Sequence, residues 1–157
     1  MAARKPLVMN AGRIQQLQAG DTLNATVTEV EMISVIADAT CIAGQIVYPT
    51  TADHVNLAKA DAASTSKPMG LAAAAIASAA TGSVQTSGVV VLTTAQWDAA
   101  FGTSGGLVVG TYYYLSAVTA GLGTSTAPST VGQYDVELGL ALSTTELLLR
   151  IRQEILL

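Results

Sequence analysis

The sequence predicts a mainly β protein: a compact antiparallel β-barrel or β-sandwich with one short helix and an extended N-terminal arm. Short apolar stretches alternate with polar residues at the two-residue period of half-buried strands. Turn residues separate these stretches about every ten residues, as in barrels and sandwiches. The chain has 157 residues and can bury one core without disulfides. We therefore expect an arm at residues 1–20 and a single β-rich body at residues 21–157.

Charge is unusually scarce. Charged residues make up 11% of the chain, against about 25% in typical soluble domains. Between Pro68 and Tyr134 the only charged residue is Asp98, and Thr, Ser, Gly, Ala and Gln replace the missing charges. Such a surface suits burial between subunits better than isolation in water.

The first twenty residues predict an arm. Pro6 blocks an early helix, and Gly12 and Gly20 interrupt the rest of the segment. Three basic residues precede the first acidic residue, Asp21, so a basic arm joins an acidic body. Basic and apolar side chains together favour docking on an acidic, partly apolar surface. The expected contact residues are Arg4, Lys5, Pro6, Leu7, Val8, Ile14 and Leu17.

Three strands are expected in the first half of the body. Alternating apolar and polar residues predict a strand at 22–28, and a short apolar run predicts another at 32–36. A third is expected at 41–48, ended by Pro49, which cannot donate a hydrogen bond to a sheet. The small and polar residues at 50–68 predict a loop or an irregular excursion.

Two segments in the middle of the body are rich in apolar residues. Alanine at 71–80 favours a helix, but the flanking glycines and the valine-rich run after them favour a buried strand, which we prefer. The β-branched residues at 88–92 predict a further strand.

A short helix is expected directly after that strand. Thr93 and Gln96 have the three-residue spacing of a capping box. Trp97 and Phe101 should point inward from this helix, and Gly102 should end it.

A flexible link at 103–106 and a strand at 111–117 come after the helix. The strand contains three consecutive tyrosines, so Tyr112 and Tyr114 lie on one face and Tyr113 on the other. We expect the three to fill the core and a subunit interface; stacking on sugars or bases is the alternative.

The clearest hairpin is at the C-terminal end. Apolar residues alternate over 134–142 on one face, the turn residues 143–145 come next, and the alternation resumes over 147–151. Ion pairs across the two strands would fix their register. The expected partners are Asp135 or Glu137 with Arg150 or Arg152.

The sequence indicates no catalytic site, metal site or cofactor. The single His54 follows Asp53 in an expected loop, without the Gly-x-Ser-x-Gly turn of a serine hydrolase, and the single Cys41 is expected to be a buried apolar residue. The carboxylates lack metal-binding spacing, and residues 102–106 lack the lysine of a phosphate-binding loop. A net charge of −4 argues against nucleic-acid binding, and no apolar stretch is long enough for a membrane span.

Two segments resemble structural proteins of tailed bacteriophages. Residues 5–24, KPLVMNAGRIQQLQAGDTLN, and residues 110–157, beginning GTYYYLSAVTAGLG, are similar to small head-decoration (cement) proteins, with related segments in tail and fibre proteins. The resemblance implies a β-rich body that forms a homotrimer on the capsid exterior. It also implies an N-terminal segment that runs over neighbouring major capsid subunits.

The expected function is therefore that of a structural virion protein, made in the host bacterial cytoplasm because the N-terminus lacks a secretory signal. Its expected partners are the major capsid protein and further copies of itself, with no nucleic acid or membrane. The alternative is a tail or fibre component that binds a host glycan through the tyrosine-bearing strand. A carbohydrate-active enzyme with carboxylates distant in sequence is the third hypothesis.

Overall fold

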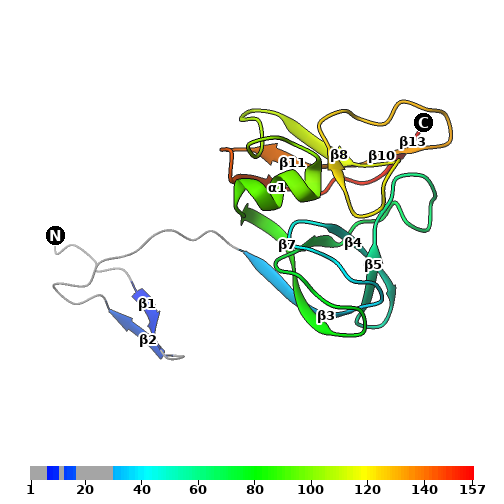
Figure 1. The fold of residues 1–157 in the computed structure, drawn as a ribbon. Coiled ribbons are helices and arrows are strands. Elements are labelled where there is room, and N and C mark those ends of the chain that lie inside the picture. Colours follow the sequence, from blue (N-terminus) through cyan, green and yellow to red (C-terminus); the bar gives the residue numbers. More distant parts are fainter. Residues whose placement is uncertain (1–6, 11–12, 17–29) are drawn as a thin grey trace.

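The computed structural model describes residues 7–10, 13–16 and 30–157, and its fold is mainly β with one short helix (Figure 1). The expected fold class is confirmed. Part of the main sheet closes into a barrel, and the rest of that sheet extends from the barrel. The strand expected at 22–28 lies outside the described residues.

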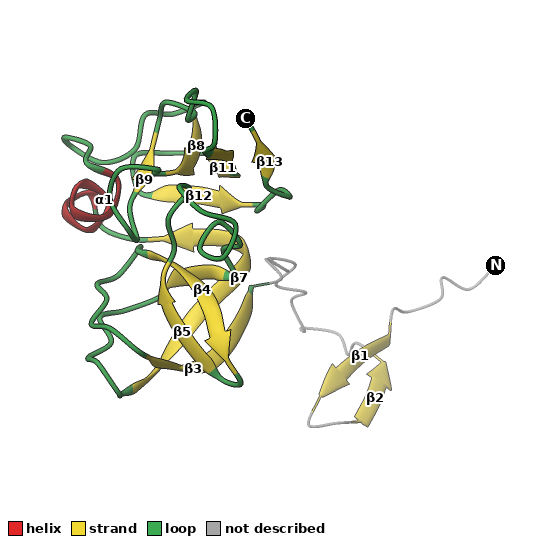
Figure 2. Cartoon of the chain, turned by 90° about the vertical axis from the view of Figure 1, so that its right-hand side faces the viewer, coloured by secondary structure: helices red, strands yellow, loops and turns green. Residues whose placement is uncertain are grey.

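Five strands close the barrel, which forms the lower half of the body in Figure 2. β3 pairs with both β5 and β7, so the order β3-β5-β4-β6-β7 returns to its first strand, and closure removes exposed sheet edges. β3 with β5 is the one parallel pair of the barrel. The barrel strands are β3 (Glu31–Ala37), β4 (Ile46–Thr51), β5 (His54–Leu57), β6 (Gly70–Ala72) and β7 (Thr81–Val91). One buried cluster takes a valine from each of four strands: Val35, Val47, Val55 and Val84.

The long strand β7 belongs to both halves of the body. Its residues 81–87 pair with β3, whereas 88–91 pair with β12. The second sheet then continues in the order β12-β11-β8-β9. Its strands are β8 (Tyr112–Leu115), β9 (Gly123–Thr124), β11 (Glu137–Ala141) and β12 (Glu146–Leu149). Two separate two-stranded sheets pair β1 (Leu7–Asn10) with β2 (Arg13–Gln16) and β10 (Tyr134–Asp135) with β13 (Ile155–Leu156).

The helix α1 (Thr94–Phe101) forms as its capping box predicts. The Thr93 side chain accepts a hydrogen bond from the Gln96 amide at 3.3 Å, and the Gln96 side chain accepts one from the Thr93 amide at 2.9 Å. Trp97 and Phe101 are buried in the main core, and their rings meet edge to face at 5.0 Å. The helix ends at Gly102, whose φ of 63° lies in the left-handed region.

The carboxylate of Asp98 fixes the segment after the helix, which was expected to be a flexible link. It accepts hydrogen bonds from the Thr103 hydroxyl at 2.8 Å, the Gly105 amide at 3.0 Å and the Gly106 amide at 2.8 Å. These bonds, led by the one from the Gly106 amide, lower the pKa of Asp98. The only charge between residues 68 and 134 therefore organises a loop.

The strand expected at 41–48 has different bounds. β4 starts at Ile46, because Gly44 has a φ of 84° and turns the chain just before it. β4 also runs through Pro49, which pairs with β5 beyond the part of β4 that pairs with β6. Because β6 does not pair with β4 at Pro49, the missing N–H of the proline removes no hydrogen bond to β6.

Two other segments also differ from expectation. Residues 50–68, expected to lack regular structure, contain β5, which comes after a turn at Asp53 with a φ of 61°. At 71–80 only the first two residues continue the strand β6, and the chain then bends, with one isolated bridge between Ile76 and Cys41.

The C-terminal hairpin is confirmed, but a β-bulge in β11 changes which residues face the core. β11 and β12 pair antiparallel, and the register of β11 against β8 shifts between Glu137 and Gly139. Because a bulge inserts one residue, the alternation reverses after it. Leu138 and Ala141 are buried, whereas Leu140, expected on the face of Leu138, lies outward.

Candidate functional site

A row of apolar side chains crosses four strands on the outer face of the second sheet. Register places Leu148 of β12 beside Val89 of β7 and beside Leu140 of β11. Leu140 in turn lies beside Tyr112 of β8, which is 46% exposed. The other three side chains are partly exposed. We call Val89, Leu148, Leu140 and Tyr112 the outer row.

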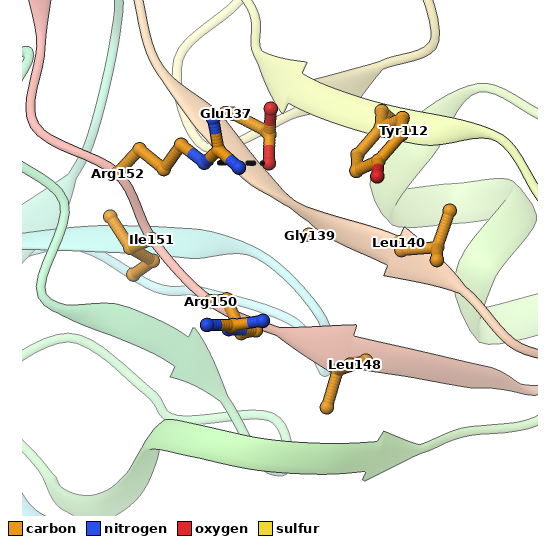
Figure 3. Close-up of a pocket in the computed structure, with 8 residues that line it drawn as sticks. All are labelled: Tyr112, Glu137, Gly139, Leu140, Leu148, Arg150, Ile151 and Arg152. Carbon is orange, nitrogen blue, oxygen red and sulfur yellow. Dashed lines mark ion pairs between the residues drawn. The ribbon is translucent and has the colours of Figure 1, made fainter.

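Charged side chains lie along one side of the outer row, where a groove of about 210 Å³ opens between β8, β11 and the chain after β12 (Figure 3). Arg152 Nε lies 3.1 Å from Glu137 Oε1, which confirms one of the expected cross-strand pairs. Arg150 lies between this pair and Leu148 in Figure 3. The groove thus combines an aromatic ring, aliphatic side chains and both signs of charge.

Two opposite charges next to the outer row have no partner within residues 30–157. Of the four Lys and Arg residues in that range, only Arg150 makes no ion pair. Glu146 at the other end of β12 likewise makes none there. Burial alternates along β12, so Glu146 and Leu148 share the outer face while Leu147 and Leu149 face the core. Arg150 directly follows β12 and lines the same groove as Leu148.

The three tyrosines expected at a subunit interface have different environments. Tyr113 is 0% exposed, and its hydroxyl accepts a hydrogen bond from the Val108 amide at 3.0 Å, so it belongs to the core. Tyr112 and Tyr114 lie on the outer face. Burial raises the pKa of Tyr114, and the negative charges of Glu137 and Asp135 raise it further. Two of the three therefore remain in a position to contact another molecule.

Part of the expected docking arm lies within the described residues. β1 contains Leu7 and Val8, β2 contains Ile14, and the two strands form a hairpin with Leu7 opposite Gln16. The other expected contact residues lie outside the described residues: Arg4, Lys5, Pro6 and Leu17.

A polar cluster surrounds Asp38, after β3. Asp38 Oδ1 lies 2.8 Å from His54 Nδ1, and Asp38 Oδ2 accepts a hydrogen bond from the Thr50 hydroxyl at 2.6 Å. These bonds, first that from Thr50 and then that from His54, lower the pKa of Asp38. Because the imidazole and the hydroxyl both bind the carboxylate, they are not arranged as a base and its nucleophile. The cluster ties the chain after β3 to β4 and β5.

Cys41 and the acidic residues form neither a reactive thiol site nor a metal site within the described residues. Cys41 is buried, and burial raises the pKa of its thiol, which keeps it protonated and unreactive. Within the ranges described, no group of three or more His, Cys, Asp or Glu residues is placed to hold a metal ion. No helix there is long and apolar enough to cross a membrane.

A second groove, of about 290 Å³, lies between the loop after β8 and the loop at 124–133. All of its lining residues are uncharged, and Val118 on its border is 82% exposed.

Compared with known proteins, the chain matches no protein-family model and shows no significant similarity to any curated protein. The residues, their geometry and the resemblance of residues 5–24 and 110–157 therefore remain as the grounds for a function.

Proposed function

We propose that the chain is a structural virion protein of a tailed bacteriophage. In this role it is a capsid decoration (cement) protein that binds the outside of the phage head and clamps neighbouring major capsid subunits. The observation that carries the proposal is the outer row, an apolar surface on a body with too few charges to keep subunits apart. The resemblance of residues 5–24 and 110–157 to decoration proteins supports the same function.

The arm supplies the second element of the mechanism. Residues 1–20 carry basic and apolar side chains, which suit an acidic, partly apolar surface of the major capsid protein. Ordering an arm on a partner costs conformational entropy. In the homotrimer that the resemblance implies, three arms offset this cost, because binding of the first raises the effective concentration of the others. The clamp needs no catalytic residue and no cofactor.

Immunogold electron microscopy of purified virions, with an antibody against the folded body, tests the location. Dense label over the head is the expected result. Label confined to the tail would overturn the proposal, since a decoration protein occupies many sites on the head and a fibre few.

Deletion of residues 1–20 tests the arm. The truncated protein should no longer bind bare expanded capsids in co-sedimentation, while its circular dichroism spectrum keeps the signature of the folded body. A matched control replaces residues 1–20 with a scrambled segment of the same composition, which preserves length and charge. Capsid binding that survives the deletion would remove the arm from the mechanism.

A second function has one specific observation in its favour. Exposed Tyr112 borders a groove with Glu137, Arg150 and Arg152, and a ring beside hydrogen-bonding charged groups is suited to a sugar. A tail or fibre component would use this groove to bind a host glycan. Glycan-array binding that disappears in Tyr112→Ala, together with tail label, would favour this function over the capsid.

A further inference from the structure

The charges on the outer face of β12 would pair with those of a second β12 that faces it and runs in the opposite direction. Glu146, Leu148 and Arg150 succeed one another on that face, so a negative end, an apolar centre and a positive end lie along one line. Both charged residues lack an ion-pair partner within residues 30–157. Any partner that runs antiparallel to β12 with the same pattern would pair both charges at once.

We propose that this face binds a second copy of the chain about a two-fold axis that runs along the outer row. Rotation about such an axis turns the sheet over and reverses β12. Leu148 then meets Leu148 of the second copy, and Glu146 of each copy meets Arg150 of the other. Because the axis follows the row, the outer-row residues of the two copies also meet: Val89, Leu140 and Tyr112. This is an isologous interface, in which one surface binds itself.

The packing geometry fits two facing sheets. Sheets stack about 10 Å apart with their strands about 30° from alignment, a separation that partly exposed leucine and valine side chains can fill. Val91, beside Glu146 in the register, is 64% exposed and extends the apolar surface toward that end. A two-fold contact joins copies in pairs, and in an assembly of trimers it would join copies of neighbouring trimers.

Charge favours a second copy over a charged partner of another kind. The face carries Glu137, Glu146, Arg150 and Arg152, two charges of each sign, and one pair is already satisfied within the chain at 3.1 Å. A uniformly acidic partner would satisfy Arg150 but would bring like charge against Glu146, and a basic partner would do the reverse. Only a partner with alternating signs satisfies both, and this chain has that pattern itself.

Charge reversal and its rescue test the proposal by analytical ultracentrifugation of the full chain. The wild type should sediment as an even-numbered assembly. Glu146→Arg and Arg150→Glu should each weaken association on the order of thirtyfold, because each puts like charges together at two symmetric positions. The double variant should recover association to within about threefold of the wild type, because the pairs are restored with their signs exchanged.

A matched control separates this interface from a general effect of net charge. Lys67→Glu makes the same charge change as Arg150→Glu at a loop position whose side chain is 64% exposed, and it should leave association unchanged. Circular dichroism should show that all variants remain folded. A monomeric wild type, a trimer unaffected by the single reversals, or a double variant as weak as the single ones would overturn the proposal.

Discussion

Leu147 and Leu148 are neighbours on β12 that face opposite sides of the sheet, and alanine should have very different effects at the two positions. Leu147 is 0% exposed in the main core, so Leu147→Ala leaves a cavity and should lower the free energy of unfolding by about 3 kcal/mol. Leu148 is half-buried beside an open groove. Leu148→Ala removes about three carbons worth about 0.8 kcal/mol each when buried, so half burial gives about 1 kcal/mol.

Urea unfolding monitored by tryptophan fluorescence is the appropriate assay. Trp97 is the only tryptophan of the chain and is fully buried, so its emission reports on the core that Leu147 belongs to. An unchanged denaturant slope would show that the two variants expose the same surface on unfolding. In thermal unfolding the same losses correspond to decreases in Tm of about 6–12 °C for Leu147→Ala and about 2–4 °C for Leu148→Ala.

Equal losses at the two positions in dilute protein would refute the assignment of faces on β12. The proposed two-fold contact adds a dependence on concentration, because a second copy would bury Leu148 but would leave Leu147 unchanged. The cost of Leu148→Ala should therefore rise with protein concentration, whereas that of Leu147→Ala should stay constant.

Two further predictions concern the loop that Asp98 organises. Because the folded state lowers the pKa of Asp98, the carboxylate contributes stability that is complete above its unfolded pKa of about 3.9 and is lost as pH falls toward the folded value. Asp98→Asn should therefore lower Tm at pH 7 and flatten its acid dependence, and an acid profile identical to that of the wild type would exclude this role. Gly105→Ala and Gly106→Ala both place a side chain at positive φ, but only at Gly106 would the new carbon collide with the Thr144 carbonyl oxygen. Thermal unfolding should show that the free energy of unfolding falls by about 1 kcal/mol for Gly105→Ala and by clearly more for Gly106→Ala. Equal losses would show that backbone strain at positive φ, and not the collision, sets the cost.

The elements that the sequence predicts correctly have signals within a few neighbouring residues. The capping box of Thr93 and Gln96 lies within four residues, and a side chain to backbone contact over that span needs no tertiary partner. The C-terminal hairpin is also local, since its two strands are joined directly by a short turn. Both elements were therefore predictable from their own residues.

Barrel closure depends on contacts that no local pattern carries. β3 pairs with β7 across about fifty residues, with Ile36 opposite Thr81, and β7 then continues into a different sheet. The sequence does not predict β5, because its only alternating apolar residues are Val55 and Leu57, and so short a pattern also occurs in loops. Its position becomes clear only once β4 forms a hairpin with it through the turn at Asp53.

The candidate site likewise combines a residue that the local sequence predicts with an arrangement that it does not predict. Tyr112 was expected at an interface from its strand alone, whereas the outer row depends on the bulge in β11. Simple alternation places Leu140 on the face of Leu138, and one inserted residue moves it to the outside next to Leu148. Gly139 is the signal that could have revealed this, since glycine inside a strand often marks a bulge or a close backbone contact. An added Cβ there would meet the Leu148 carbonyl oxygen.

The positions of the few charged residues show which of them could contact another protein. Asp98 is engaged by its own loop, so the long stretch around it offers no uncommitted charge to an approaching protein. Glu146 and Arg150 make no ion pair within residues 30–157. They lie at the start of β12 and directly after its end, where the proposed two-fold contact pairs each with the other in a second copy. The uncharged groove beside Val118 would stay outside that two-fold contact, because none of its lining residues belongs to the outer row. The two surfaces therefore differ in kind: hydroxyl-bearing and small residues line most of the groove, whereas only the outer row has opposite charges on its two sides that a second copy would pair.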